Sequence, residues 1–291
     1  MGQLLASLEI LVPIEIVDKL SNLYEAAPIS SYSYVRQLIK NELGRDLEEI
    51  FIEFDATPVK SGSIAQIHFA KLKANGEKVA VKIQHSKLKE ELFTDMKLIE
   101  FFVNVGEMMF TNFNYQWLIQ DMKRNLPQEV DFLIEASNCE KMKGLLKNEK
   151  RITVPDIYNQ ATTSKILTMS YEEGFAITEK ERMKKENIDV NSVARELAYC
   201  FSRSIFEYGF VHADPHPGNI FVRKDKKKGF ELILLDHGIY RPLSRDIRVA
   251  YSTLWNGIFL QDAGIIKNAC KLIGLEKEDY KIFTAMVTKQ E

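Results

Sequence analysis

The chain has 291 residues, of which 45% are hydrophobic and 27% are charged. This ordinary globular composition excludes wholesale disorder and a collagen-like repeat, and the length allows one large domain or two lobes that share a core. The 39 Lys and Arg and the 41 Asp and Glu give a net charge of -2. A dedicated nucleic-acid-binding protein usually has an excess of positive charge, so we expect no nucleic-acid partner.

Cysteine spacing and short apolar runs exclude two further classes of protein. Cys139, Cys200 and Cys270 are too far apart for a metal knuckle or a disulfide framework, so we interpret them as reduced core residues. The apolar runs are much shorter than the roughly 18 residues that a membrane-spanning helix needs, which predicts no transmembrane span. The N-terminus has no basic region and no run of arginines, so we expect no targeting segment within this chain.

Residues 1–56 are predicted to form a helical N-terminal extension. Apolar residues recur at intervals of three and four from Leu4 to Leu43, which predicts three short amphipathic helices. Ser33 is the expected N-cap of the last helix, and Gly44 is its expected C-cap.

Residues 57–172 are predicted to form an N-terminal lobe with inserted helices. Between Thr57 and Gln84, β-branched and apolar residues are interrupted by Gly62 and by the hairpin signal Asn75-Gly76, which predicts a small antiparallel sheet. Two helical segments and two strands should complete the lobe, with the helices at 87–106 and 115–147 and the strands at 153–158 and 165–171. Pro127 is expected to mark a helix start or a kink within the second helical segment.

Residues 173–291 are predicted to form a mostly helical C-terminal lobe. A buried helix is expected from Asn191 to Tyr208, with Gly209 as its C-terminal cap, and the polar loop 212–219 follows it. Two short strands should flank the charged turn 224–229, and a strong helical pattern returns from Ser244 onward.

Lys82 lies inside the apolar stretch VAVKIQ, residues 79–84, where strand alternation places it on one face with Ala80 and Gln84. Taken alone, a strand lysine most often extends to solvent. Here it follows a turn with Gly and Ser at residues 60–63 and a hairpin, and it precedes acid-bearing helices. This is the order of parts in the nucleotide-binding lobe of a kinase, in which such a lysine holds the α and β phosphates of ATP.

Three polar residues later in the chain have the spacing of a kinase catalytic site. Asp214 and Asn219 are five residues apart, as are the catalytic Asp and the metal-binding Asn of the kinase catalytic loop. Asp236 follows a predicted hairpin in Asp-His-Gly, where kinases have a metal-binding Asp. Carboxylate and amide oxygens are hard ligands that suit Mg²⁺, so we predict that Asn219 and Asp236 bind the metal and that Asp214 is the catalytic carboxylate.

A competing interpretation takes His212, Asp214 and His216 as the zinc site of a hydrolase, because His-x-Asp-x-His can place three ligands around one ion. We disfavour this interpretation because it gives Lys82 and Asp236 no role. The histidines are then structural or supporting, and none is expected to be catalytic: His68, His85, His212, His216 and His237.

The acidic partner of Lys82 should come from residues 126–140, LPQEVDFLIEASNCE. If this segment is one helix, Asp131 and Glu135 are one turn apart on the same face, and Glu129 lies off it. Glu135 is therefore the preferred catalytic partner of Lys82, with Glu129 as the alternative.

These motifs together carry a family resemblance. The sequence resembles the UbiB/ABC1/aarF-domain-containing atypical kinases, and most of all their aarF-domain-containing kinase 1 subgroup. The matching stretches are spread over residues 1–260 and read SIAQIHFAKLKANGEKVAVKIQH, LPQEVDFLIEASNCEKM, ILTMSYEEG, FVHADPHPGN and LLDHGIY.

The resemblance implies an α+β, bilobal protein-kinase-like fold with an N-terminal helical extension, and it implies ATP and Mg²⁺ as cofactors. The residues expected to contact ATP are Ser61, Gly62, Ser63, Lys82, Met169 and Tyr171. The alanine-rich phosphate loop of the family reads VKSGS here, at residues 59–63, with no run of alanines. Gly62 makes it more like an ordinary kinase loop, because a glycine lets backbone N–H groups approach phosphate oxygens closely.

Two further motifs of the family are regulatory. Glu129 and Asp131 match Glu-x-Asp, and Gln3 matches the end of Lys-x-Gly-Gln in the extension. The lysine of that motif would precede Met1, so we expect this chain to be part of a longer protein, and Glu291 comes early for a complete C-terminal lobe.

The resemblance also implies a mitochondrial location, a link to coenzyme Q or lipid metabolism, and a lipid or membrane surface as a partner. The expected function is therefore that of an ATPase or an unorthodox kinase. The alternative is a regulatory module in which bound ATP switches the conformation and no phosphate acceptor exists. Asp214 favours the enzyme, because a switch needs no catalytic carboxylate.

Overall fold

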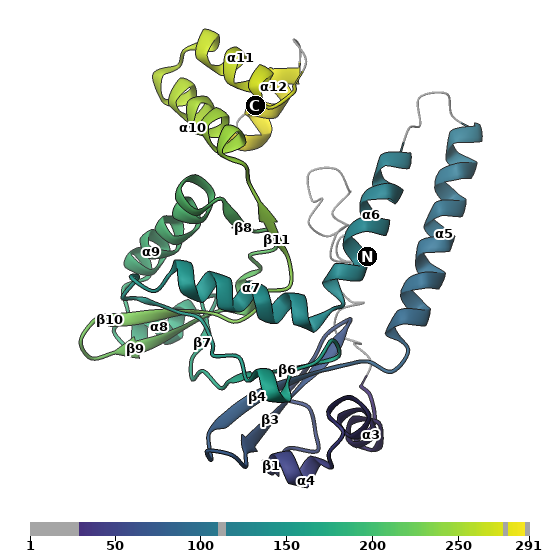
Figure 1. Ribbon diagram of the computed structural model, residues 1–291. Coiled ribbons are helices and arrows are strands. Elements are labelled where there is room, and N and C mark those ends of the chain that lie inside the picture. The colour runs from purple at the N-terminus through teal and green to yellow at the C-terminus, as the bar shows by residue number, and fades with distance from the viewer. Residues whose placement is uncertain (1–28, 110–114, 276–278, 289–291) are drawn as a thin grey trace. The chain divides into compact units, whose positions relative to one another are not determined.

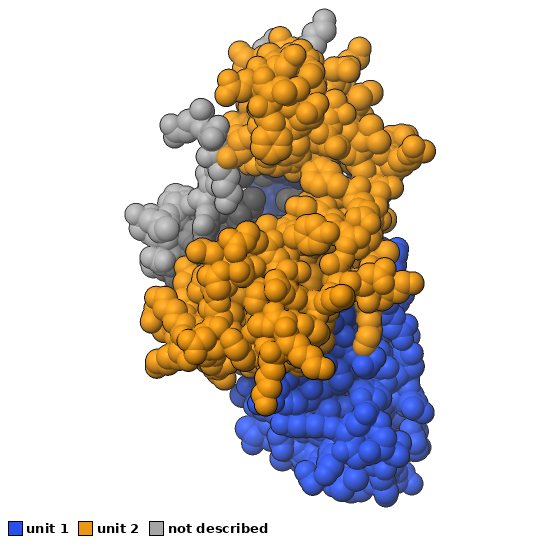
Figure 2. Space-filling model, turned by 90° about the vertical axis from the view of Figure 1, so that its left-hand side faces the viewer, with its two compact units in different colours: residues 1–141, 154–173 blue, residues 142–153, 174–291 orange. Residues whose placement is uncertain are grey.

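The computed structural model describes residues 29–109, 115–275 and 279–288 (Figure 1). Gln3 and the first two predicted helices lie outside the described residues. The chain divides into two compact units, which Figure 2 shows in blue and orange: residues 1–141 with 154–173, and residues 142–153 with 174–291.

The first unit is built on an antiparallel sheet of five strands. Its order is β1-β3-β4-β6, and β2 pairs with β3. The strands are β1 (Phe51–Phe54), β2 (Lys60–Ser61), β3 (Ala65–Leu72), β4 (Lys78–Gln84) and β6 (Ile166–Ser170). The predicted hairpin joins β3 to β4, and Gly76 has a φ of 73°, which a residue with a side chain rarely adopts. The small antiparallel sheet predicted from the sequence is therefore confirmed.

Helix α3 (Tyr32–Leu43) and helix α4 (Leu47–Ile50) share a hydrophobic core with this sheet. Val35 and Ile39 of α3 are fully buried in the same cluster as Val79 and Val81 of β4. The helix ends at Gly44 as predicted, with a φ of 67°.

The N-cap of α3 is Ser31 rather than the predicted Ser33. The Ser31 hydroxyl accepts a hydrogen bond from the Tyr34 N–H, so the helix begins at Tyr32. Ser33 is then a residue of the first helical turn.

Three longer helices follow β4: α5 (Leu88–Met109), α6 (Gln116–Glu129) and α7 (Phe132–Leu145). The sequence predicted one helical segment where α6 and α7 stand, with Pro127 at a start or kink. The break comes three residues later, at Val130 and Asp131, whereas Pro127 lies inside the last turn of α6. None of the helices in the described ranges is both long and apolar enough to cross a membrane.

The second unit contains a four-stranded sheet and a separate strand pair. The sheet has the order β5-β10-β9-β7, in which only the β5 and β10 pair is parallel. Its strands are β5 (Ile152–Thr153), β7 (Phe175–Ala176), β9 (Ile220–Asp225) and β10 (Gly229–Leu234). Strand β8 (Phe210–His212) pairs with β11 (Tyr240–Pro242). The β9–β10 hairpin is the one predicted around the charged turn.

Helix α9 (Val190–Arg203) runs into a π-helical turn, η2 (Ser204–Tyr208), that ends at Gly209. Gly209 has a φ of 61°, and a Cβ there would lie 2.8 Å from the Leu243 carbonyl oxygen, so the position requires glycine. The remaining short and C-terminal helices are η1 (Asn159–Ala161), α8 (Lys180–Lys185), η3 (Pro217–Asn219), α10 (Arg245–Leu260), α11 (Ala263–Leu272) and α12 (Asp279–Thr288).

The three cysteines are all buried and unbridged. Burial raises the pKa of the Cys200 thiol to about 12, so that thiol is protonated and unreactive at neutral pH. The interpretation of Cys139, Cys200 and Cys270 as reduced core residues is confirmed.

Candidate active site

Lys82 and Glu135 form a buried ion pair in the first unit. The Lys82 ammonium donates to Glu135 Oε1 over 2.9 Å and to Oε2 over 2.8 Å. Lys82 is 9% exposed and Glu135 is 3% exposed, so the reading of Lys82 as a lysine that extends to solvent is wrong. The predicted pairing of Lys82 with Glu135 is confirmed.

The sheet and the start of α7 hold this pair in place. Gln84, which shares the Lys82 face of β4, donates its side-chain N–H to the Val130 carbonyl oxygen over 2.7 Å. The Phe132 N–H donates to the Ser164 carbonyl oxygen over 3.1 Å, and the fully buried Phe132 ring lies with its centroid 5.1 Å from Lys82 Nζ. Glu135 therefore projects from a helix that is anchored just before its start to β4, which carries Lys82, and in its first turn to Ser164, two residues before β6.

Asp131 and Glu129 lie at the junction between α6 and α7. The prediction of one continuous helix is wrong, because the helix is interrupted there, but Asp131 lies one turn before Glu135 and its carbonyl oxygen accepts from the Glu135 N–H over 3.4 Å. Asp131 precedes α7, and its side chain accepts a hydrogen bond from the Leu133 N–H over 3.0 Å, so it caps the new helix. Glu129 is the last residue of α6.

The predicted phosphate loop connects β2 to β3. The Gly62 N–H donates to the Ala65 carbonyl oxygen over 2.8 Å, so the turn itself uses this N–H. Gly62 does not have a positive φ, and a Cβ built there would lie in ordinary contact, 3.7 Å from the Ala65 oxygen. A side chain at Gly62 would therefore meet neither backbone strain nor a clash, and the turn does not itself require glycine.

Met169 and Tyr171 lie at the end of β6 and just after it. Met169 is buried in a cluster with Phe132, and the Tyr171 N–H donates to the Lys78 carbonyl oxygen over 3.1 Å. The Lys78 ammonium lies 3.7 Å from the centroid of the Tyr171 ring, within the range of a cation–π interaction. The contact of Met169 and Tyr171 with a nucleotide remains a prediction.

In the second unit, His212 connects the main chains of Asp214 and Asp236. His212 Nε2 donates to the Asp236 carbonyl oxygen over 2.9 Å, and His212 Nδ1 accepts from the Asp214 N–H over 3.2 Å. Because a carbonyl only accepts and an N–H only donates, this pattern requires the neutral ring with its proton on Nε2. Burial lowers the pKa of His212, which favours the same neutral form.

Asn219 is connected to the same region through Leu235. The Leu235 N–H donates to the Asn219 carbonyl oxygen over 3.0 Å, one residue before Asp236. The Asp236 carboxylate accepts from the Gly238 N–H over 2.9 Å, which fixes the Asp-His-Gly turn. The structure therefore brings Asp214, Asn219 and Asp236 together in one unit, as the sequence predicted.

The histidines of this region do not form a zinc site. Both ring nitrogens of His212 face main-chain groups, and no cluster of three or more His, Cys, Asp or Glu that could hold a metal occurs among the described residues. The zinc interpretation of His212, Asp214 and His216 is therefore wrong. Asp236 offers a partly exposed carboxylate and Asn219 an amide oxygen, the hard ligands that Mg²⁺ prefers.

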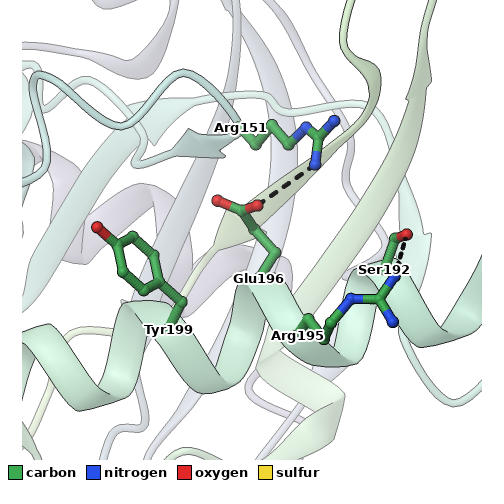
Figure 3. Close-up of a pocket in the computed structure, with 5 residues that line it drawn as sticks. All are labelled: Arg151, Ser192, Arg195, Glu196 and Tyr199. Carbon is green, nitrogen blue, oxygen red and sulfur yellow. Dashed lines mark hydrogen bonds and ion pairs between the residues drawn. The ribbon is translucent and has the colours of Figure 1, made fainter.

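A hollow of about 400 Å³ lies elsewhere in the second unit and contains none of the predicted site residues (Figure 3). Its lining is polar but internally paired. Arg151 lies 3.5 Å from Glu196, and Arg195 donates to the Ser192 hydroxyl over 2.9 Å. With Tyr199, these residues line an open surface hollow whose charges already have partners.

Comparison with known proteins agrees with these motifs. The chain matches the ABC1 atypical kinase-like domain over residues 22–270. It is 40% identical to "AarF domain-containing protein kinase 1" of Xenopus laevis over 288 residues, and 39% identical to "AarF domain-containing kinase 1" of Drosophila melanogaster over 287 residues. Each alignment covers 99% of this chain and 55% of the relative, so the chain spans about half the length of these curated relatives.

One solved structure has a similar fold. It is titled as the complex of Rv3197 with erythromycin from Mycobacterium tuberculosis, and it superposes with a TM-score of 0.68 at 24% sequence identity. The match covers 94% of this chain and 68% of that chain. The chain has an α+β, protein-kinase-like fold and belongs to the ABC1 atypical kinase-like family.

Proposed function

We propose that this chain binds Mg-ATP and acts as an ATPase or a phosphotransferase. The observation that carries the proposal is the buried pair of Lys82 and Glu135. A buried ion pair contributes little to stability compared with apolar residues of the same volume, because both charges lose their hydration. Such a pair in a kinase-like fold is better explained by ligand binding, with Glu135 orienting the Lys82 ammonium toward the α and β phosphates of ATP.

Asp236 and Asn219 would hold the magnesium ion. A bound magnesium ion would neutralise charge on the β and γ phosphates. The Asp236 main chain is held by the His212 ring, and the Asp236 carboxylate is oriented by the Gly238 N–H. This support would leave the proposed metal ligand in a defined position before the ion binds.

Asp214 is the proposed catalytic carboxylate. Its side chain is exposed, and its main chain is fixed by the hydrogen bond to His212. In the proposed reaction, an acceptor oxygen forms a bond to the γ-phosphorus while the bond from that phosphorus to the bridging oxygen of ADP breaks. The proton of the acceptor moves to the Asp214 carboxylate. With water as the acceptor the products are ADP and phosphate.

The remaining assignments follow the family. Ser61, Gly62, Ser63, Met169 and Tyr171 would contact ATP. Gln3, Glu129 and Asp131 would have a regulatory role. A mitochondrial location, a link to coenzyme Q or lipid metabolism, and a lipid or membrane surface as partner are part of the same proposal.

Incubation of the protein with labelled Mg-ATP, with and without lipid extracts, tests the proposed function. We expect the wild type to release the label as phosphate or to transfer it to an acceptor. The Asp214→Asn variant should form neither product. If the wild type binds ATP and turns it over no faster than the Asp214→Asn variant, the enzyme is excluded and the regulatory module is favoured. If the wild type binds no ATP, the proposal is wrong.

A further inference from the structure

His85 holds the predicted phosphate loop at two points. It follows β4 directly and is 7% exposed. Its Nε2 lies 3.0 Å from the Gly62 carbonyl oxygen, and its main-chain N–H donates to the Ile64 carbonyl oxygen over 3.1 Å. A third contact joins its Nδ1 to the Ser30 hydroxyl over 3.0 Å.

The chemistry of the partners determines which ring nitrogen of His85 carries the proton. The Gly62 carbonyl oxygen can only accept, so His85 Nε2 must donate to it. In the neutral ring Nδ1 is then an acceptor, and the Ser30 hydroxyl donates to it. Ser30 is fixed in turn by Gln66, which is fully buried: the Ser30 N–H donates to Gln66 Oε1 over 2.7 Å, and Gln66 Nε2 donates to the Ser30 carbonyl oxygen over 3.1 Å.

The bond to Gly62 sets the direction of the next N–H group. In a planar trans peptide the C=O and the N–H point in opposite directions, and the described residues contain no cis peptide bond. Because the Gly62 carbonyl points toward the buried ring of His85, the Ser63 N–H points away from it. Gly62 and Ser63 are both exposed, so this N–H is directed away from the protein interior.

The Ser63 N–H is also an unused donor. In the part of the chain that the structure describes, it donates to no protein group, whereas the Gly62 N–H is used by the turn. A backbone N–H held by its own loop and lacking a protein acceptor suits a phosphate oxygen. Gly62 has no side chain to obstruct the approach of such a ligand.

We propose that His85 is a positioning residue of the phosphate loop, and that it orients the Gly62–Ser63 peptide so that the Ser63 N–H binds a phosphate oxygen of ATP. The proposal rests on the proposed function, because the phosphate belongs to the nucleotide. In this proposal His85 does not contact the nucleotide. The donor to the phosphate is the Ser63 N–H and not the Gly62 N–H.

Calorimetric titration with Mg-ATP and with adenosine tests the proposal. In His85→Leu the carbonyl loses its donor, and the loss of one oriented hydrogen bond to a charged group should lower ATP affinity about 10-fold while leaving adenosine affinity unchanged. His85→Gln keeps an N–H donor and should restore most of the ATP affinity. Thr168→Val is the matched control, because Thr168 is a fully buried polar residue of the same sheet whose hydroxyl donates to the Ala161 carbonyl oxygen over 2.6 Å and contacts neither the loop nor His85.

A measurement on the wild type removes any dependence on how the variants fold. The backbone amide signal of Ser63, followed by NMR, should shift on addition of Mg-ATP and not on addition of adenosine. If the wild type binds ATP and this signal does not move, or if Thr168→Val lowers the ratio of ATP to adenosine affinity as much as His85→Leu, the positioning role is wrong and the proposed function stands. If the wild type binds neither ligand, the proposed function has failed as well.

Discussion

The Lys82 ammonium donates to both carboxylate oxygens of Glu135, a residue 53 positions further along the chain. Removing one partner leaves the other charge buried and unpaired. We therefore expect Lys82→Met to destabilise the protein by about 3–5 kcal/mol. Urea unfolding measures the loss, and Lys71→Met on neighbouring β3 is a control that should change stability by no more than about 0.5 kcal/mol.

The double variant Lys82→Met/Glu135→Leu separates stability from ligand binding. With both charges replaced by apolar side chains, most of the lost stability should return. Binding of Mg-ATP should not return with it, because the phosphate ligand is gone. A double variant less stable than Lys82→Met would contradict the interpretation of the pair as a functional rather than a structural feature.

Asp214→Asn should abolish turnover while leaving the affinity for Mg-ATP within about twofold of wild type, because the proposed base acts on the acceptor and not on the nucleotide. Phosphate release and calorimetric affinity, measured on the same preparation, check the two parts. Lys82→Ala should instead lower both the turnover rate and the affinity for Mg-ATP. Full ATP hydrolysis by Asp214→Asn would show that the catalytic assignment is wrong.

Gly62→Ala isolates the effect of a methyl group on the ligand. The turn accommodates a Cβ in ordinary contact, so stability should stay unchanged or rise by up to about 1 kcal/mol through the less flexible unfolded chain. We expect ATP affinity to fall and adenosine affinity to stay unchanged, because the added methyl group obstructs the close approach of a phosphate to the loop. An equal loss for both ligands, or no loss, would place the phosphate away from this residue.

His68 makes stability depend on pH. Burial lowers the pKa of His68, and its neutral ring donates from Nδ1 to the Asp55 carbonyl oxygen over 2.7 Å. Below the ordinary pKa of 6.5 the unfolded chain binds a proton that the folded chain does not, so this stabilisation is present above pH 6.5 and is lost as the pH falls through the folded pKa.

The His68→Gln variant measures this contribution. The difference in unfolding free energy between wild type and variant should be largest above pH 6.5 and should narrow as the pH is lowered. A difference that is constant from pH 7.5 to about 5 would mean that His68 titrates alike in the folded and unfolded states.

Local patterns were sufficient to predict much of the fold and part of the site. The β3–β4 hairpin follows from Asn75-Gly76 between alternating strands, and the pairing of Lys82 with Glu135 follows from a charge inside an apolar strand that must find an opposite charge. The order of Asp214, Asn219 and Asp236 carried the family resemblance because these residues are close in sequence and separated only by one hairpin.

Contacts between distant residues could not be predicted in this way. At the break between α6 and α7, the Gln84 side chain donates a hydrogen bond to the Val130 carbonyl oxygen, 46 residues away. The helical periodicity of the sequence gives no information about such a long-range contact. His85 likewise contacts Gly62 across 23 residues. The sequence signal for His85 was only a polar residue directly after a buried strand, a pattern too common to assign a role.

Stabilisation by Mg-ATP tests the central claim most directly. At 100 times its Kd, Mg-ATP should add about 2.7 kcal/mol to the stability of the wild type. The magnesium-dependent part of this gain should be absent in Asp236→Asn and retained in Asp246→Asn, a control in the first turn of α10. A melting temperature that saturating Mg-ATP leaves unchanged in the wild type would contradict the account.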